Sequence, residues 1–395
     1  MKLAFLADAR SPIAINWVRW FVEKHHEVHW ISSRPADSPL AGLASFRVLS
    51  IFPELPGGTR VAGGHKILHP AATALRHWLL PLRLGSKAKE LGRMVEDIRP
   101  DLLHAMRIPQ EGMTAAWMRK SGRAGSSIPL LVSVWGDDFT FHARSSPMMM
   151  SLTHETMEQV DGLHSDCYRD IKLAFQWGLR IDTKLLVEPG NGGIDLSTFF
   201  AGKTDFSFIR EYGLPKDAFF ILNPRGFRNV ARSDTFFRAI PLVRKAVPNA
   251  HFLALKMAGN SEAESWIRKM DIQSCVTLLS ALPREKMPQL FRTSPVMTSL
   301  TLHDGIPNVL LEAMACGSFP ICGDLESIRE WIEDGKNGLL VSPADPQSVA
   351  AAIIRAAIDP GLRKAAAARN KKIIAGRAGW NSVMSRVEKF YHGLT

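Results

Sequence analysis

Two carboxylates with a fixed spacing lie in the last third of the chain. Asp304 and Glu312 are eight positions apart, and segment 305–308 between them reads Gly-Ile-Pro-Asn. Asn308 is a residue type that caps helices, so we expect a helix there with Glu312 in its first turns and Gly317 at its end. The free N–H groups of a helix N-terminus suit a diphosphate, and a carboxylate accepts hydrogen bonds from vicinal hydroxyls. This segment therefore predicts a site for a phosphorylated, hydroxyl-rich ligand.

A basic side chain in the middle of the chain fits the same ligand. Residues 219–224 are apolar and strand-like, and Arg225 and Gly226 follow at once. A guanidinium group at the carboxyl end of a strand binds phosphate through two parallel hydrogen bonds. Arg225 is therefore a candidate phosphate ligand, with an ordinary surface charge as the alternative.

The elements that must position these residues alternate between strand and helix. Strands are predicted at 2–7, 28–32, 101–106, 130–135, 161–165 and 184–187, and again at 219–224, 251–255, 276–279, 296–299 and 319–322. Such alternation indicates parallel sheets with helices on both faces. The glycine- and proline-rich segment 188–193 interrupts the pattern and is the predicted linker. We expect one domain over 1–190, a second over 191–375, and a C-terminal helix over 376–395 that crosses back to the first.

The first strand ends in a polar loop that contains Asp8 and Arg10. The loop has no Gly-x-Gly, which argues against a dinucleotide fingerprint. It still lies at the carboxyl end of a strand, where open α/β sheets bind ligands. Asp8 and Arg10 are therefore candidate binding residues, and an ordinary connecting loop is the alternative.

Composition sets further limits on function. The net charge of +11 and a pI near 9.6 favour anionic partners. No nucleic-acid motif accompanies this charge, so no nucleic-acid partner is expected. Four cysteines without paired spacing and the absence of a leader sequence predict a cytoplasmic protein with reduced thiols. No zinc-finger spacing or aspartate-rich motif stands out, so no metal is expected.

Segment 60–99 combines basic side chains with Trp and Leu. The segment contains eight Lys and Arg residues and three acidic residues, which gives it a net charge of +5. One interpretation is a peripheral contact with an anionic membrane, on its inner face. The alternative is a solvated helix face with core anchors. Pro70 and Pro81 are expected to break any long helix here.

Segment 304–317 resembles the donor-binding motif of glycosyltransferase family four (glycosyl transferases group 1), which are retaining enzymes of the GT-B fold. The family pattern is an acid, Gly, any residue and Pro, then Glu eight positions after the acid, then Ala-Met-Ala-x-Gly. Here it reads Asp304-Gly-Ile-Pro to Glu312-Ala-Met-Ala-Cys-Gly. Asp304 stands where Glu is commoner. The resemblance implies an α/β protein with two Rossmann-like domains, parallel sheets and an interdomain cleft.

The resemblance also implies roles for individual residues. Asp304 would contact the transferred sugar and Glu312 the nucleoside ribose. Arg225 and a second cation would hold the donor diphosphate; Arg232 is preferred over Arg228 for the second. The remaining candidates on the donor side are Lys256, which a solvated lysine explains equally well, and the loop and helix residues Gly305, Pro307, Asn308 and Val309. Loops 256–259 and 280–286 would flank the nucleotide base.

In the first domain, the resemblance points to the loop that starts at Trp135. Asp138 matches a family aspartate that faces the donor sugar, while Trp135 stands where His is commoner. The loop with Asp8 and Arg10 would face the acceptor. His104 has no assigned role and is more simply a packed strand histidine.

The predicted activity is that of a retaining hexosyltransferase in polysaccharide or glycolipid biosynthesis. The donor is a nucleoside-diphosphate sugar, with uridine favoured over guanosine, and the acceptor is a hydroxyl of a saccharide or a lipid-linked acceptor. No separate cofactor is expected. The alternatives are a non-catalytic nucleotide-sugar binding protein and a GT-B hydrolase or epimerase that acts on its sugar nucleotide without an acceptor.

Overall fold

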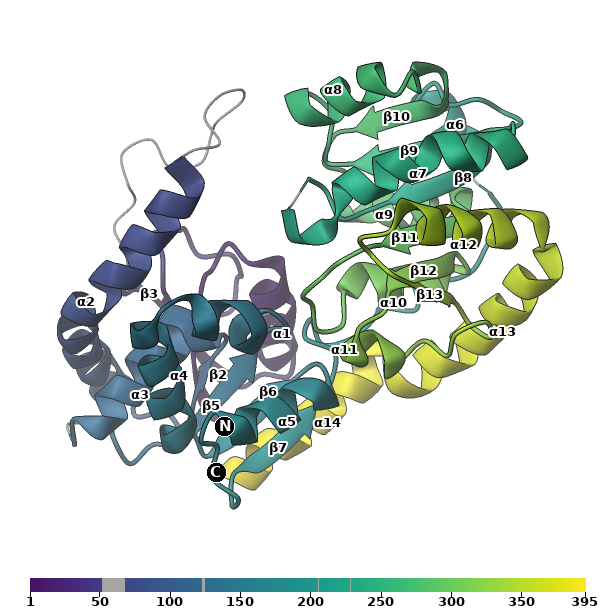
Figure 1. Ribbon diagram of the computed structural model, residues 1–395. Helices are drawn as coiled ribbons and strands as arrows, with labels where there is room; N and C mark the ends of the chain where they lie inside the picture. The colour runs from purple at the N-terminus through teal and green to yellow at the C-terminus, as the bar shows by residue number, and fades with distance from the viewer. Residues whose placement is uncertain (52–67, 123–124, 205, 228) are drawn as a thin grey trace. The chain divides into compact units, whose positions relative to one another are not determined.

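The computed structural model of the 395-residue chain describes all residues except 52–67, 123–124, 205 and 228, and describes residues 68–82 and 229 without their side chains. It divides into two compact units (Figure 1). Unit 1 comprises residues 1–193 and 381–395, and unit 2 comprises residues 194–380. The chain therefore enters unit 2 once and returns to unit 1 for its last helix.

Unit 1 contains a parallel sheet of seven strands in the order β3-β2-β1-β4-β5-β6-β7. The strands are β1 Lys2–Ala7, β2 Glu27–Ser32, β3 Ser45–Val48, β4 Leu102–Ala105, β5 Leu130–Val134, β6 Gly162–Ser165 and β7 Lys184–Val187. Six of these match predicted strands. The sequence analysis missed β3, whose four residues are half-buried or exposed and show no apolar run.

Helices cover both faces of this sheet (Figure 1). They are α1 Pro12–Glu23, α2 Leu68–Ile98, α3 Met113–Lys120, α4 Pro147–Gln159, α5 Tyr168–Gln176 and α14 Trp380–Leu394, with short turns η1 Ile108–Gly112, η2 Asp138–His142 and η3 Ala143–Ser145. The helices α2, α3 and α4 share one hydrophobic core with the sheet. Aromatic contacts join α1 and α14 on the other face, where Phe21 stacks on Tyr391 with ring centroids 4.7 Å apart.

Helix α2 corrects one prediction. It runs for 31 residues through both Pro70 and Pro81, so neither proline breaks it. Pro70 is the third residue of α2 within the bounds that the structure describes. Beyond Pro81, burial of Leu84, Leu91 and Val95 against the sheet holds the helix together at the cost of one backbone hydrogen bond.

A buried polar chain crosses the sheet of unit 1 from α14. The Tyr391 hydroxyl lies 2.8 Å from Trp17 Nε1 and 2.5 Å from His104 Nδ1. His104 Nε2 lies 2.8 Å from Ser133 Oγ, which lies 2.8 Å from His164 Nδ1. Burial lowers the pKa of both histidines, that of His164 to about 4, so both rings are neutral at pH 7. His104 is thus a packed strand histidine.

Unit 2 contains a second parallel sheet, with strand order β10-β9-β8-β11-β12-β13. The strands are β8 Phe219–Asn223, β9 Ala250–Leu255, β10 Val276–Leu279, β11 Val296–Ser299, β12 Phe319–Gly323 and β13 Leu339–Val341. The helices are α6 Phe206–Glu211, α7 Ser233–Ala246, α8 Ser261–Lys269, α9 Met287–Thr293, α10 Asn308–Cys316, α11 Glu326–Arg329, α12 Pro346–Ile358 and α13 Pro360–Arg377, with turns η4 Asn229–Ala231, η5 Gln273–Cys275 and η6 Arg284–Lys286. Each unit is thus a Rossmann-like α/β layer structure.

A search of the helices within the described residues finds none with the length and apolar character needed to cross a membrane.

Candidate active site

The start of helix α10 organises the candidate site of unit 2. The helix begins at Asn308, and Pro307 occupies the cap position without a side-chain hydrogen bond. The prediction that Asn308 caps the helix is therefore wrong. Pro307 has the extended backbone of a cap residue, with φ −63° and ψ 127°, which moves Asn308 into the first helical position. Gly317 ends the helix at φ 83°, as predicted.

Asp304 and Arg225 lie together, although 79 positions separate them in the chain. Arg225 Nη2 donates to Asp304 Oδ2 at 2.5 Å. Both side chains stay partly accessible, at 16% and 21%. Among the residues that the structure describes, no acceptor lies within hydrogen-bonding distance of the buried Arg225 Nε. Because Nε is itself buried, a ligand phosphate would meet the guanidinium group at its partly accessible edge.

Glu312 is buried in the first turns of α10, with 7% of its side chain exposed. Its carboxylate lies 3.3 Å from Arg284 Nη1, in the predicted base-flanking loop. Burial raises the pKa of Glu312 to about 7, although the positive charges of Arg284 and Lys256 oppose the rise. Near neutral pH this group can therefore both donate to and accept from a ligand hydroxyl.

Two predicted phosphate ligands lie on unusual backbone. Arg232 has φ 44° and Lys256 has φ 60°, and both values lie in the left-handed region that costs free energy for a residue with a side chain. Arg232 pairs with Asp234 through two hydrogen bonds, at 2.9 and 2.8 Å. Lys256 packs close to Gly226, where an added Cβ would lie 3.3 Å from Lys256 Cβ. Arg228, the alternative to Arg232, lies outside the described residues.

The other donor-side candidates surround the start of α10. Gly305 and Pro307 are buried, whereas Asn308 and Val309 are half-buried. Gly305 has no side chain and the Pro307 ring is buried, so these two residues shape the loop backbone and offer little side-chain surface to a ligand. The donor roles of these residues stay predictions.

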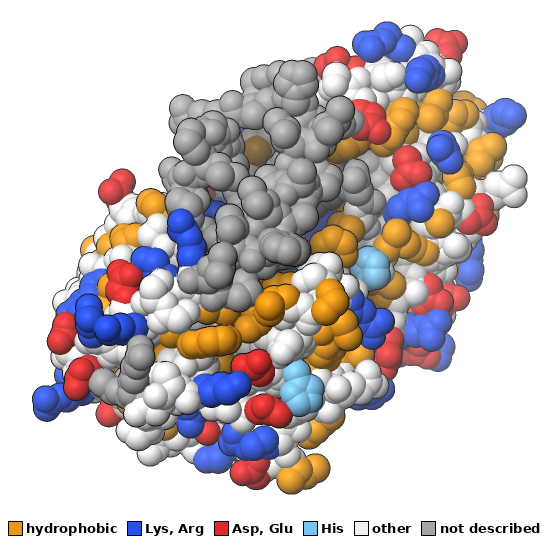
Figure 2. All heavy atoms as spheres, turned by 60° about the vertical axis from the view of Figure 1, so that its left-hand side comes forward, with side chains coloured by type: hydrophobic (Ala, Val, Ile, Leu, Met, Phe, Trp, Pro, Cys, Tyr) orange, Lys and Arg blue, Asp and Glu red, His pale blue; other side chains and the backbone are white. Residues whose placement is uncertain are grey.

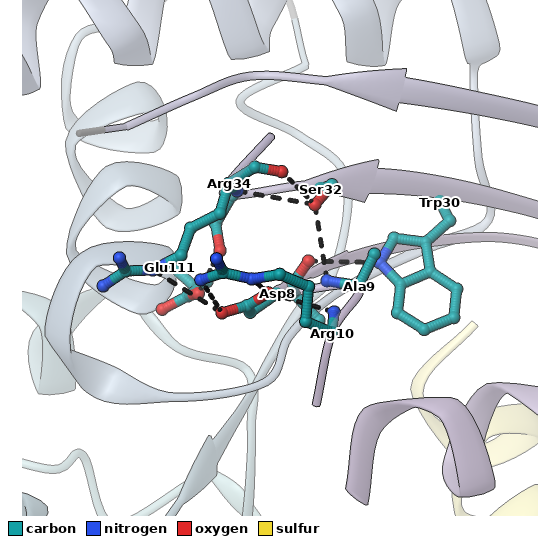
Figure 3. Close-up of polar contacts among 9 residues, drawn as sticks. Asp8, Ala9, Arg10, Trp30, Ser32, Arg34 and Glu111 are labelled. Carbon is teal, nitrogen blue, oxygen red and sulfur yellow. Dashed lines mark hydrogen bonds and ion pairs between the residues drawn. The ribbon is translucent and has the colours of Figure 1, made fainter. Parts of the chain in front are cut away.

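Asp8 and Arg10 form a salt bridge in unit 1 (Figure 3). Arg10 Nε and Nη2 each donate to the Asp8 carboxylate at 3.0 Å, and Arg34 Nε lies 3.5 Å from it. Burial opposes ionisation of Asp8, but the hydrogen bonds from Arg10 and the charges of Arg10 and Arg34 lower its pKa below the usual value. Asp8 is therefore ionised at neutral pH.

A cavity of about 140 Å³ opens beside Asp8. Its lining includes Arg34, Arg107, Glu111, Trp135 and His142. None of Arg34, Arg107 and Glu111 was a predicted site residue. The sequence indicated them only through their position: each follows the carboxyl end of a strand, which is where open α/β sheets bind ligands.

Asp138 lies next to this cavity and is 1% exposed. Arg107 Nε donates to Asp138 Oδ1 at 2.9 Å, while the backbone N–H of Trp135 donates to Oδ2 at 3.0 Å. Arg107 also bonds Asp137 at 2.9 Å. The Asp138 carboxylate is therefore engaged in holding its own loop and Arg107. Its contact with a donor sugar stays a prediction.

Comparisons with known proteins agree with this architecture. The family described as "Glycosyl transferase 4-like" matches residues 2–166, and "Glycosyl transferases group 1" matches residues 220–359. The chain belongs to glycosyltransferase family four. The two family models and the glycosyltransferases among its relatives support the transferase assignment and do not favour the binding-protein or hydrolase alternatives.

Two curated relatives illustrate how far the sequences diverge within the family. The chain is 24% identical to a D-inositol 3-phosphate glycosyltransferase of Thermomonospora curvata over 220 residues, 51% of this chain and 50% of that protein. It is also 24% identical to an N-acetyl-alpha-D-glucosaminyl L-malate synthase of Bacillus anthracis over 380 residues, 94% and 90% of the two chains. The match to the first relative thus spans only half of its length.

Solved structures show the GT-B fold. Sucrose-phosphate synthase from Thermosynechococcus elongatus superposes with a TM-score of 0.78 at 15% identity, over 100% of this chain and 99% of the other. Anabaena HepE in complex with UDP-glucose superposes with a TM-score of 0.75 at 15% identity, over 100% of both chains.

Proposed function

We propose that this glycosyltransferase transfers a sugar from a nucleoside-diphosphate sugar to a hydroxyl of a saccharide or lipid-linked acceptor, with retention of anomeric configuration. The observation that carries the proposal is the pairing of Arg225 with Asp304 in unit 2, near the start of α10 and the buried Glu312. The arrangement offers a cation and helix N–H groups for a diphosphate, and two carboxyl groups for hydroxyls.

In the proposed reaction, the bond between the anomeric carbon and the diphosphate oxygen breaks, and a bond to the acceptor oxygen forms. Negative charge develops on the leaving diphosphate, and Arg225 with the N-terminus of α10 stabilises it. The released phosphate oxygen takes the proton of the acceptor hydroxyl. No protein nucleophile is required.

Uridine is the preferred nucleoside in this proposal. The Anabaena HepE structures contain UDP, UDP with glucose, or UDP-glucose. At 15% identity they support the choice of UDP-glucose as the first ligand to test.

A thermal-shift screen with UDP, GDP, ADP and their common sugar conjugates tests the donor. A ligand that binds only the folded state raises the apparent melting temperature. We expect a rise with UDP and UDP-sugars. The absence of a shift with every nucleotide at millimolar concentration would contradict the proposal.

A further inference from the structure

Glu111 is a buried carboxyl group in unit 1 to which the proposed transfer chemistry gives no role. It is 6% exposed, lies in η1 just after β4, and lines the cavity beside Asp8. The Ser33 hydroxyl donates to Glu111 Oε1 at 2.5 Å. Figure 3 shows Glu111 next to Asp8 and Arg34. Ser33 thus holds one oxygen of the Glu111 carboxyl group by a hydrogen bond, and the residue also lines the cavity.

A strained turn places this carboxyl group. Gln110, the preceding residue, has φ 75° and ψ −71°, and its carbonyl accepts a hydrogen bond of 2.5 Å from Thr114. At Gly112, the following residue, an added Cβ would lie 2.9 Å from the Arg107 carbonyl oxygen. Only a residue without Cβ fits there. Strain of this kind persists where the surrounding structure requires it and is concentrated at functional sites.

The charges around the cavity do not favour an anion. Arg34 lies 3.5 Å from the Asp8 carboxylate, and Arg107 bonds the two carboxylates at 137–138 at 2.9 Å. Arg34 shares the Asp8 carboxylate with Arg10, whereas Arg107 pairs with two carboxylates, so three guanidinium groups face three carboxylates in addition to Glu111. A phosphate or carboxylate bound there would lie against Asp8 and Glu111, and would have to displace an existing ion pair.

Neutral hydrogen-bonding groups remain for a ligand. Trp135 Nε1–H is buried, and within the described parts of the chain it has no acceptor. Burial raises the pKa of Glu111 to about 7, although the Ser33 hydrogen bond and Arg107 oppose the rise. Its carboxyl group therefore donates and accepts hydrogen bonds near neutral pH. Both residues line the cavity, and an indole N–H and a protonated carboxyl group are chemically suited to hydrogen-bond the hydroxyls of a ring.

Building on the proposed transfer, we propose that Glu111 is a specificity-determining residue for the acceptor. It holds a hydroxyl of an uncharged, hydroxyl-rich acceptor in the unit 1 cavity. The carboxylates around this cavity disfavour phosphorylated or carboxylated acceptors. The acceptor class is thus a neutral sugar or polyol group.

Saturation-transfer NMR on the full chain tests acceptor binding in the absence of any donor nucleotide. The probes are methyl glycosides of common hexoses and myo-inositol, each with the corresponding phosphate. We expect saturation of at least one neutral probe and weaker saturation of its phosphate. The Glu111→Ala substitution should weaken binding of the neutral probe about tenfold, because it removes a buried hydrogen-bonding group. Glu111→Gln keeps a donor and an acceptor and should bind within about twofold of the wild type.

Glu23→Ala, at the exposed end of α1, is the matched control and should bind like the wild type. Melting temperatures confirm that each variant is folded. Equal binding by wild type and Glu111→Ala, stronger saturation of the phosphates, or no saturation of any neutral probe would overturn the inference. Since no nucleotide is present, failure of the thermal-shift screen leaves this result unaffected, and the two proposals can fail separately.

Discussion

Individual acids do different work in the two units because their surroundings differ. Asp8 is ionised because two arginines face it, whereas burial keeps Glu111 and Glu312 about half-protonated at pH 7. An ionised carboxylate pairs with cations, and a half-protonated one suits hydroxyls. The same residue type thus supplies either a charge or a neutral hydrogen-bonding group.

Glu312→Ala should weaken binding of a UDP-sugar by about tenfold, because a buried hydrogen-bonding partner of the ligand is lost. Isothermal titration with UDP-glucose measures the effect. The control is Asp217→Ala, an exposed acid of unit 2. Unchanged affinity in the Glu312 variant would remove its assigned ribose role.

Helix α14 shows how one element completes a unit that began far away in the sequence. It extends the polar chain through Tyr391, and His164 at the other end lies 3.0 Å from the Glu188 carbonyl oxygen. Arg386 Nη2 donates to the Glu188 carboxylate at 2.8 Å. The helix is therefore fixed to the linker as well as to the sheet.

Tyr391→Phe should lower the free energy of unfolding by about 1–3 kcal/mol, because Trp17 Nε1–H and His104 Nδ1 lose their buried partner. Urea denaturation followed by fluorescence measures this loss. Lys389→Ala, on the exposed side of the same helix, should change stability by less than about 0.5 kcal/mol. Equal effects of the two substitutions would refute the importance of the polar chain.

Helix α2 allows a refined test of membrane binding, which stays a prediction. Arg83, Lys89 and Arg93 are exposed, whereas Lys87 donates to the Leu49 carbonyl oxygen and to Glu90, at 2.7 Å in each case. On the face seen in Figure 2, basic and acidic side chains are interspersed with apolar patches.

Replacing Arg83, Lys89 and Arg93 with Ala should lower the partition constant onto anionic vesicles by about a hundredfold, measured by co-sedimentation, since each cation near such a surface contributes about 1 kcal/mol. Lys87 is left intact because its hydrogen bonds serve the fold. Neutral vesicles are the control. Equal sedimentation of the variant and the wild type would leave the solvated helix as the explanation.

At the scale of the whole molecule, buried titratable groups give stability two opposite dependences on pH. Glu111 and Glu312 have raised pKa values in the folded state, so they lower stability as pH rises from about 4.5 to about 7. His104 and His164 have lowered pKa values, so they lower stability as pH falls below 6.5. The stability of the wild type as a function of pH is the sum of these opposite contributions. A variant that lacks one titrating group isolates the contribution of that group.

Glu111→Gln should raise stability by about 2 kcal/mol at pH 8 and by less at pH 5. At pH 8 the wild type pays for a buried negative charge that faces Asp8, with partial relief from Ser33 and Arg107, and the amide avoids this cost. Melting temperatures at both pH values measure the difference. A gain of the same size at pH 5 would show that ionisation of Glu111 is not the cause.

The sequence by itself determined the features that depend on neighbouring residues. Alternating apolar segments predicted eleven of the thirteen strands that the structure describes. The helix-forming residues after Pro307 predicted helix α10 with its glycine end at 317. Short-range propensity decides such features. It failed for β3, which lacks an apolar run, and for β13, which has only three residues. It also failed at Asn308, where the backbone of Pro307 moved the cap by one residue.

Only the tertiary structure decided the features that depend on distant contacts. It brought Arg225 to Asp304 across 79 positions, and it kept α2 intact through Pro81 because packing outweighed one lost hydrogen bond. It also buried Glu111 against Ser33, 78 positions away, and so raised its pKa. Burial and charge pairing follow from the folded surroundings of a side chain, so no local pattern could reveal them.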